Sequence, residues 1–404
     1  MSRAKQLSED TMESARNYYY GITRKMLSIS GQWPYQKRRA KVFGVTLITS
    51  VTLSLIVPQV CKLIYCDKDV QCILGTTPSF LLTNMILLKL YTCQFNSNKI
   101  RNLTDQLTDD WKQLRTREEF DIMTKYAANG RQISLIYSFY CYTACGLFVW
   151  ISVTPRLLDI VIPLNESRPL ILPYEAHYFV DDNEYFFHIL IHSFVSVEVG
   201  ITGVLAHDCM LITYIEHTCS VFAVAGFRFE NLHDNKIDKN IDVRSNSSSK
   251  IYNRRIGVSM HAHWRALQFA DLLEDTFNIT FVLQIAIVCL GMSITLLQIA
   301  MQSNDVMEAA RYVAFIIGQL IHLFCFSVQG QRLIDHSMEM RDKVYNCTWY
   351  NIPVKSQKLL LQVMRKSLQP NVLTAGKIYV FSLKSFTTIV QTSMSYFTVL
   401  SSFQ

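Results

Sequence analysis

The sequence predicts an all-α polytopic membrane protein with seven transmembrane helices. Half of its 404 residues are hydrophobic and only 18% are charged, whereas soluble proteins of this length have about 25% charged residues. The apolar residues are gathered in runs of about 20, the helix length that crosses roughly 30 Å of hydrocarbon. These runs are too long and continuous for the strands of a membrane barrel, so helices remain as the way to satisfy the backbone.

Seven segments qualify as spans, and the third, fourth and seventh are rich in Phe and Tyr. The segment before the first span is polar and basic, without the short apolar core of a signal peptide. We therefore expect the first span itself to direct insertion. The predicted spans are residues 43–63, 73–93, 132–153, 187–215, 277–301, 308–328 and 376–403.

Lys and Arg residues lie almost entirely on one side of this predicted membrane. The segments 1–42, 94–131, 216–276 and 329–377 hold 32 of them, and the opposite side holds three. Basic residues are retained on the cytoplasmic side, so we expect the N-terminus in the cytoplasm and the C-terminus outside. The net charge of +7 then reflects topology and anionic membrane lipids, and we expect no nucleic-acid partner.

This orientation is the reverse of that of a G-protein-coupled receptor. The chain also lacks Asp-Arg-Tyr after its third span and Asn-Pro-x-x-Tyr in its seventh, so that class is excluded. The outer loop 154–186 is acidic and holds the sequon at Asn165, which this topology makes available for glycosylation. Cys66 and Cys72 flank the first short outer loop and are candidates for a disulfide.

Catalytic, metal and cofactor motifs are absent. There is no paired CxxC, HExxH, GxSxG, phosphate-binding or dinucleotide-binding glycine loop, so we expect no enzyme, no metal and no cofactor. Charged residues inside spans are functional candidates by default, and for Asp208 we expect structural pairing. A secondary transporter remains an alternative, although only Pro78 suggests the broken helices of that class.

Several polar segments continue the helical periodicity of the spans beside them. Residues 218–232 continue the periodicity of the fourth span, and 257–277 lead amphipathically into the fifth. Residues 331–345 and 356–368 are amphipathic as well. We expect these helices to pack together outside the bilayer, as a bundle able to hold subunits together.

The last 75 residues resemble the insect odorant receptor family. Upstream, the helix count, the inverted topology, the loop lengths and the position of Asp208 agree with that family. The matching features, in order, are Gly330, Ser337, the YNCTWYNIP block at 345–353, LLLQVMRKSLQP at 359–370, Leu373-Thr374-Ala375-Gly376 and FTTIVQTSMSYFTVL at 386–400.

The resemblance implies a ligand-gated, non-selective cation channel for small volatile organic molecules. Tuning subunits of the family assemble as a heterotetramer with a shared odorant coreceptor in the plasma membrane of sensory neuron dendrites. Gustatory relatives, the first alternative, end in Thr-Tyr, five apolar residues and Gln-Phe, whereas this chain has Ser395 and Ser402 at the first and penultimate motif positions. The coreceptor keeps that Gln and has a much longer loop than 216–276. An odorant-tuned subunit is therefore favoured.

The resemblance also assigns parts of one domain spanning residues 1–404. Residues 43–330 hold six spans with the ligand-binding bundle, 331–375 form a cytoplasmic anchor segment, and 376–404 form the pore-lining seventh helix. Val399 and Phe403 lie four residues apart on one helix face, where the resemblance places a hydrophobic gate. Thr392 continues this stripe inward. Polar residues expected to face water in the open pore are Gln391, Ser395 and Ser402.

For the ligand we expect an apolar cavity in the outer halves of the helices. Family pockets place a small residue and a Trp four apart on the third span, as Gly146 and Trp150 stand here. Packing within the protein core remains the alternative role for every residue of this set. The further candidates are Thr143, Phe139 and Tyr142 on the third span, Gly200, Ile201 and Val204 on the fourth, and Tyr312 and Phe315 on the sixth.

Overall fold

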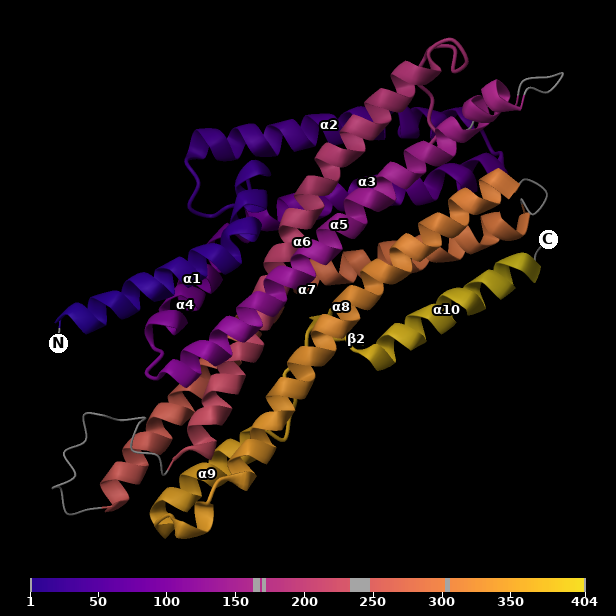
Figure 1. Ribbon diagram of the computed structural model, residues 1–404. Coiled ribbons are helices and arrows are strands. Elements are labelled where there is room, and N and C mark those ends of the chain that lie inside the picture. Colours follow the sequence, from indigo (N-terminus) through magenta and orange to yellow (C-terminus); the bar gives the residue numbers. More distant parts are fainter. Residues whose placement is uncertain (1, 163–167, 169–171, 233–247, 302–305, 403–404) are drawn as a thin grey trace.

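The computed structural model describes residues 2–162, 168, 172–232, 248–301 and 306–402 (Figure 1). Six of its helices are long and apolar enough to cross a membrane. They are α2 (Arg38–Tyr65), α3 (Val70–Phe95), α5 (Arg117–Val161), α6 (Phe186–Glu230), α7 (Ser248–Met301) and α8 (Val306–Asn346). A seventh helix, α10 (Leu383–Ser402), has 20 residues and rises about 30 Å. The predicted all-α membrane architecture is confirmed.

Helices α5 to α8 are much longer than a bilayer is thick. They contain 45, 45, 54 and 41 residues, which corresponds to roughly 60–80 Å at the rise of an α-helix. The spans thus continue into the polar segments, as the periodicity of 218–232, 257–277 and 331–345 predicts, although α6 ends at Glu230. Helix α9 (Val354–Lys366), after the short 3₁₀ turn η2 (Trp349–Asn351), provides the remaining predicted amphipathic helix.

Helix α6 lies at the centre of the bundle. Every residue from Leu205 to Phe222 is buried, which is five turns with no exposed face. Such all-round burial requires neighbours on every side, and α1, α2, α3, α5, α7 and α8 all pack against α6. Functional side chains on α6 are therefore held in a rigid, water-poor environment.

The extended ends of α6, α7 and α8 pack with α9 around a second apolar core. Phe229 of α6, Ile256 of α7, Met340 of α8 and Leu360 of α9 belong to one buried cluster. In Figure 1 this region, marked by α9, lies at one end of the molecule, and α10 runs away from it. The expected helical bundle beyond the apolar segments is thus present within a single chain.

Two helices of the polar segments were not anticipated. Helix α1 (Ser2–Ile29) packs on α5 and α6, and its Leu27 belongs to the main core. Helix α4 (Ser97–Lys112) buries Trp111, whose ring nitrogen donates a hydrogen bond of 3.2 Å to the Tyr20 hydroxyl of α1. Each of these helices has one buried apolar face, which its polar overall composition does not reveal.

The prediction that the seventh helix begins at Gly376 is wrong. Residues Thr374–Ala375 (β1) and Tyr379–Val380 (β2) instead form an antiparallel hairpin, with Gly376 at φ +63° in its turn. The Asn278 side chain accepts the Gly376 N–H at 2.7 Å and holds this turn against α7. The helix starts only at Leu383, where the Ser382 hydroxyl accepts the Ser385 N–H at 3.1 Å as an N-cap.

Candidate functional site

An apolar cavity of about 320 Å³ lies among α2, α3, α5, α6, α7 and α8, beneath the segment 173–175. Its walls combine aliphatic, aromatic and small residues, with few polar groups, as is typical of small-molecule sites. The α5 residues on this wall recur at helical spacing along one face, which explains how one straight helix contributes so many. They are Tyr137, Tyr140, Cys141, Ala144, Cys145, Phe148 and Val149.

A buried ion pair closes one end of the cavity. Lys89 of α3 and Asp208 of α6 are both fully buried, and the Lys89 Nζ donates to the two carboxylate oxygens at 2.7 and 2.8 Å. Lys89 also faces the cavity. Removing two charges from water is costly, and the bidentate geometry with additional hydrogen bonds offsets that cost.

Tyr137 and His322 extend this ion pair along the cavity wall. The Tyr137 hydroxyl donates to Asp208 at 3.1 Å, because an ionised carboxylate only accepts. Its oxygen must then accept the proton on His322 Nδ1, 2.6 Å away. His322 Nε2 is left as an acceptor for the Gln284 amide at 3.0 Å. The network thereby fixes one neutral tautomer of His322, which also lines the cavity.

The segment 172–178 covers the other end. The main chain of Leu172 accepts from Arg311 of α8 at 3.0 Å, and the His177 N–H donates to the Pro58 carbonyl of α2 at 2.9 Å. Tyr174 shares hydrogen bonds with Tyr178 at 2.6 Å and with Ser193 of α6 at 3.1 Å. Burial raises the pKa of Tyr174 and Tyr178, so both phenols stay neutral hydrogen-bonding groups.

Two buried glutamine residues belong to the cavity wall. Gln59 of α2 and Gln319 of α8 line the cavity and are 1% and 6% exposed. The Oε1 atom of each is buried without a hydrogen-bond partner in the described structure. A buried carbonyl oxygen without a donor is unfavourable by about 1–3 kcal/mol.

Four of the residues predicted to contact ligand do line the cavity: Ile201 and Val204 of α6, with Tyr312 and Phe315 of α8. Tyr142 lies beside the wall, where its hydroxyl bonds to Thr202 at 2.9 Å. Gly200 is buried against α3, where an added Cβ would lie 2.7 Å from Cδ1 of Ile86. Neither Tyr142 nor Gly200 faces the cavity.

The remaining candidates lie on the opposite face of α5, and the structure does not bring them to the cavity. Phe139 and Trp150 are 75% and 64% exposed, and Thr143 is exposed as well. A Cβ added to Gly146 would meet no atom within 4 Å. The small residue and the Trp therefore stand side by side on the outside of the bundle. Apolar residues cover both faces of this helix, so composition could not identify the inner one.

Sequence reasoning missed Tyr137 and the α5 residues around Ala144. One signal was present: Tyr137, Cys141, Ala144 and Phe148 follow helical spacing, and Tyr137 adds a polar group near mid-span. Phe148 and Phe315, which face each other with ring centres 6.4 Å apart, join the α5 and α8 walls.

Three of the predicted pore residues, Gln391, Ser395 and Val399, lie on the exposed face of α10. Ile389 and Ser393 are buried against the bundle, whereas Gln391, Ser395 and Val399 are exposed, with Thr392 beside them. Phe403 and Asn165 lie outside the described residues, and the side chain of Ser402 is not described. One face of α10 is thus available to line a pore or to meet another chain.

Cys66 and Cys72 are joined by a disulfide that closes the connection between α2 and α3. This places the two cysteines as the sequence suggested. Within the described ranges, no group of three or more His, Cys, Asp or Glu side chains is arranged to hold a metal ion.

Comparison with known proteins places these features in a family. A family model described as 7tm odorant receptor matches residues 69–394. Odorant receptor 13a of Drosophila melanogaster is 25% identical over 247 residues, covering 58% of this chain and 56% of the relative. Odorant receptor 9a of the same species is 22% identical over 276 residues, covering 68% and 66%. This chain therefore spans less than two thirds of the length of these relatives.

An odorant receptor coreceptor of Harpegnathos saltator is also similar, with 25% identity over 147 residues, or 35% of this chain and 29% of the coreceptor. Among solved structures, the insect olfactory receptor OR5 from Machilis hrabei in complex with eugenol has the same fold. The TM-score is 0.74 at 13% identity, over 97% of this chain and all of that one.

Proposed function

This chain belongs to the 7tm odorant receptor family, and from that premise we propose that it is an odorant-tuned subunit of a ligand-gated cation channel. The observation that carries the proposal is the apolar cavity of about 320 Å³. It is bounded at one end by the Lys89–Asp208 network and at the other by the segment 172–178. Such a site suits a small volatile organic molecule.

Size and polarity limit the ligand. About ten heavy atoms in an apolar site give roughly −5 to −8 kcal/mol, which corresponds to dissociation constants from about 0.1 mM to 1 μM. The buried Oε1 atoms of Gln59 and Gln319 favour a ligand that donates a hydrogen bond, such as an alcohol or a phenol. A pure hydrocarbon would leave both oxygens without a partner.

Helices α7 and α8 give the cavity a physical connection to α10. Val288 of α7 lines the cavity and also belongs to the buried cluster that holds Ile389 of α10. About two and a half turns from the cavity residue Phe315, Phe324 of α8 contacts Phe386 of α10, with ring centres 5.5 Å apart. A ligand that fits the cavity better in the open state than in the closed one would shift α10 through these contacts.

The exposed face of α10 is the proposed pore wall, with Val399 in its hydrophobic gate and Gln391 and Ser395 facing water when the pore opens. Several copies of this face are needed to enclose a pore for cations, which supports assembly with other subunits. The coreceptors among the relatives support a heterotetramer with the odorant coreceptor. The distribution of basic residues supports a cytoplasmic N-terminus, with the complex in the plasma membrane of the sensory dendrite.

The test is whole-cell current from cells that express this chain with and without the coreceptor, while volatile alcohols, phenols and hydrocarbons are applied. We expect odorant-evoked cation current with the coreceptor present, and no change when G-protein signalling is blocked. Loss of the response under that block contradicts the channel mechanism. A lack of response to every compound despite surface expression contradicts odorant tuning.

A further inference from the structure

A hollow of about 750 Å³ lies between α1, α4 and α6, and the connection from α1 to α2 completes its wall. In Figure 1, α1 and α4 lie side by side in the part of the molecule where the chain begins. Of the described residues, none lines both this hollow and the apolar cavity of about 320 Å³. The two sites are therefore separate.

The hollow lies at the level where the apolar part of α6 ends. Met210 and Tyr214 of its lining belong to the last two turns of the predicted fourth span, 187–215. The connection from α1 to α2 contributes Trp33 and Tyr35, just before the basic start of α2. Trp and Tyr are enriched where a membrane meets water. The hollow is thus at the depth of lipid headgroups and the first part of their acyl chains.

Three cations line the hollow, and two of them are available to an anion. Arg16 lies 3.9 Å from Glu13, whereas Arg24 and Lys25 are exposed and make no hydrogen bond or ion pair with the described part of the chain. The Arg24 guanidinium carbon lies 5.6 Å from the centre of the Trp33 ring. Stacking holds this guanidinium against the wall, while its N–H donors stay in the plane of the group, where an anion can accept from them.

Asp105 of α4 is the one carboxylate among the lining residues that the structure describes. Its Oδ1 accepts a hydrogen bond from the Tyr35 hydroxyl, and the Arg101 guanidinium lies 5.2 Å from the centre of the Tyr35 ring. This carboxylate therefore already has a donor and a nearby cation. Three cations against one carboxylate leave the hollow net positive, which favours an anionic occupant.

Gly21 opens an apolar space one turn from the two available cations. It precedes Arg24 and Lys25 by three and four residues, so all three lie on one face of α1. A Cβ added to Gly21 would meet no atom within 4 Å. Leu27 of α1 and Met210 of α6, both 1% exposed, add apolar lining. An apolar space beside cations suits an anion that carries a hydrocarbon chain better than a free phosphate.

We propose that this hollow binds an anionic phospholipid from the membrane leaflet that contacts α1. The headgroup phosphate accepts hydrogen bonds from Arg24 and Lys25, and an acyl chain occupies the space beside Gly21. The lipid then lies between α1 and α6, which already meet through the 3.2 Å hydrogen bond of Thr23 with Thr213. Binding depends on the membrane-spanning helices alone and not on an odorant or on ion conduction.

The first test is calorimetric titration of the detergent-purified full-length protein with dioctanoyl phosphatidylglycerol. The Arg24→Gln/Lys25→Gln double variant should bind at least tenfold more weakly, because both donors to the phosphate are lost. The matched control Arg38→Gln/Arg39→Gln removes two exposed cations from the start of α2, outside the hollow, and should stay within about twofold of the wild type. Equal weakening by the two double variants overturns the proposal, because binding would then follow net charge alone.

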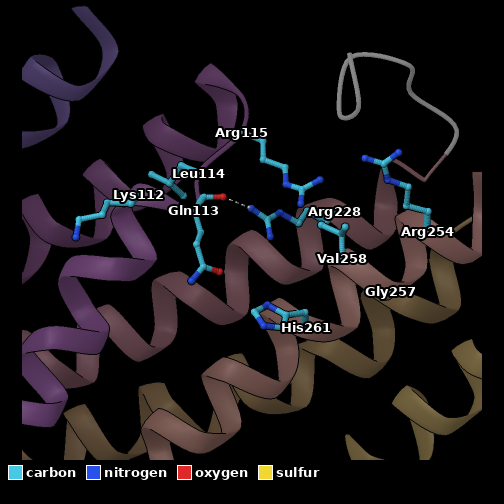
Figure 2. Close-up of a pocket in the computed structure, with 9 residues that line it drawn as sticks. All are labelled: Lys112, Gln113, Leu114, Arg115, Arg228, Arg254, Gly257, Val258 and His261. Carbon is cyan, nitrogen blue, oxygen red and sulfur yellow. Dashed lines mark hydrogen bonds between the residues drawn. The ribbon is translucent and has the colours of Figure 1, made fainter. Parts of the chain in front are cut away.

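A second test fills the apolar space and leaves every charge in place. Gly21→Phe should also weaken lipid binding at least tenfold, since the ring takes the place of the acyl chain. The control is Gly257→Phe on α7, in a different pocket shown in Figure 2, where an added Cβ likewise meets no atom within 4 Å. Thermal unfolding without lipid checks that both variants fold. Equal lipid affinity of the two phenylalanine variants overturns the proposal.

A third test separates a lipid from a soluble phosphate. Glycerol 3-phosphate carries a phosphate group without acyl chains and should not displace the lipid at a hundredfold excess. Dioctanoyl phosphatidylcholine, whose headgroup has no net charge, should bind at least tenfold more weakly than the phosphatidylglycerol. Displacement by glycerol 3-phosphate makes this a soluble phosphate site, and equal affinity for the two lipids removes the role of the cations. Either result overturns the proposal.

Discussion

Lys89 and Asp208, on two different helices, form a fully buried ion pair at the end of the apolar cavity, with Nζ 2.7 Å from Oδ1. Tyr137, His207 and His322 all lie within the same hydrogen-bond network. The pair thus connects α3, α5, α6 and α8 at one point. It determines both the packing of the bundle and the polar boundary of the ligand site.

Breaking this pair should destabilise the protein strongly. Asp208→Asn leaves the Lys89 ammonium buried without a counter-charge, and we expect a loss of about 3–5 kcal/mol of folding free energy. The Lys89→Met/Asp208→Leu double variant removes both charges and should recover most of that loss. Thermal unfolding of the detergent-purified proteins measures the stability of the single and the double variant against the wild type. Equal stability of Asp208→Asn and wild type would show that the pair is not essential to the bundle.

The two faces of α5 should respond differently to the same added bulk. Ala144→Phe places a ring in the cavity, and we expect the odorant response to fall by at least tenfold in potency. Thr143→Phe places the same ring on the exposed face and should leave potency within about twofold. Dose–response currents at matched surface expression decide between them. If Thr143→Phe lowered the potency and Ala144→Phe did not, the ligand site would lie on the face of Gly146 and Trp150.

Gln319 should discriminate ligands by their hydrogen-bond donors. Gln319→Leu removes the buried oxygen, so potency for an alcohol or phenol agonist should fall about tenfold. The methyl ether of the same agonist lacks the donor and should lose little, which makes it the internal control. A parallel loss for both compounds would indicate a change in cavity shape instead. Concentration–response curves for the matched pair provide the measurement.

Gly330 permits a close approach between α8 and Phe381, which lies two residues before α10. A Cβ at this position would lie 2.2 Å from the Phe381 carbonyl oxygen, so Gly330→Ala must separate two backbones. We expect a loss of more than about 2 kcal/mol and reduced surface expression. Gly146→Ala is the control, because its Cβ meets no atom within 4 Å, and it should be neutral or slightly stabilising. Equal surface expression of the two variants would contradict the steric argument.

Val399 should control the resting current if α10 lines the pore. Val399→Ser makes the proposed gate easier to hydrate, so we expect current without odorant in cells that also express the coreceptor. Ile389→Val changes the buried face of the same helix by one methylene, and the resting current should be unchanged. Silent Val399→Ser channels that still open with odorant would place the gate elsewhere.

The first and last parts of the chain show where sequence reasoning reached its limit. Hydropathy located the apolar helices because crossing a bilayer imposes a length and a composition on each segment. It missed α1 and α4, whose single buried faces are too narrow to alter a polar average. It also placed the start of the seventh helix at Gly376, because apolar Tyr379 and Val380 suit a helix and a hairpin equally well.

The sequence by itself determined the class of protein, the number of apolar helices, their extension beyond the bilayer and the family. All of these follow from one-dimensional patterns of hydrophobicity, charge and motif. Only the tertiary structure decided which face of α5 meets the cavity, that Lys89 reaches Asp208, and that Gln59 and Gln319 face the same space. In a membrane helix both the lipid-facing and the inward faces are apolar, so only packing against neighbouring helices tells them apart.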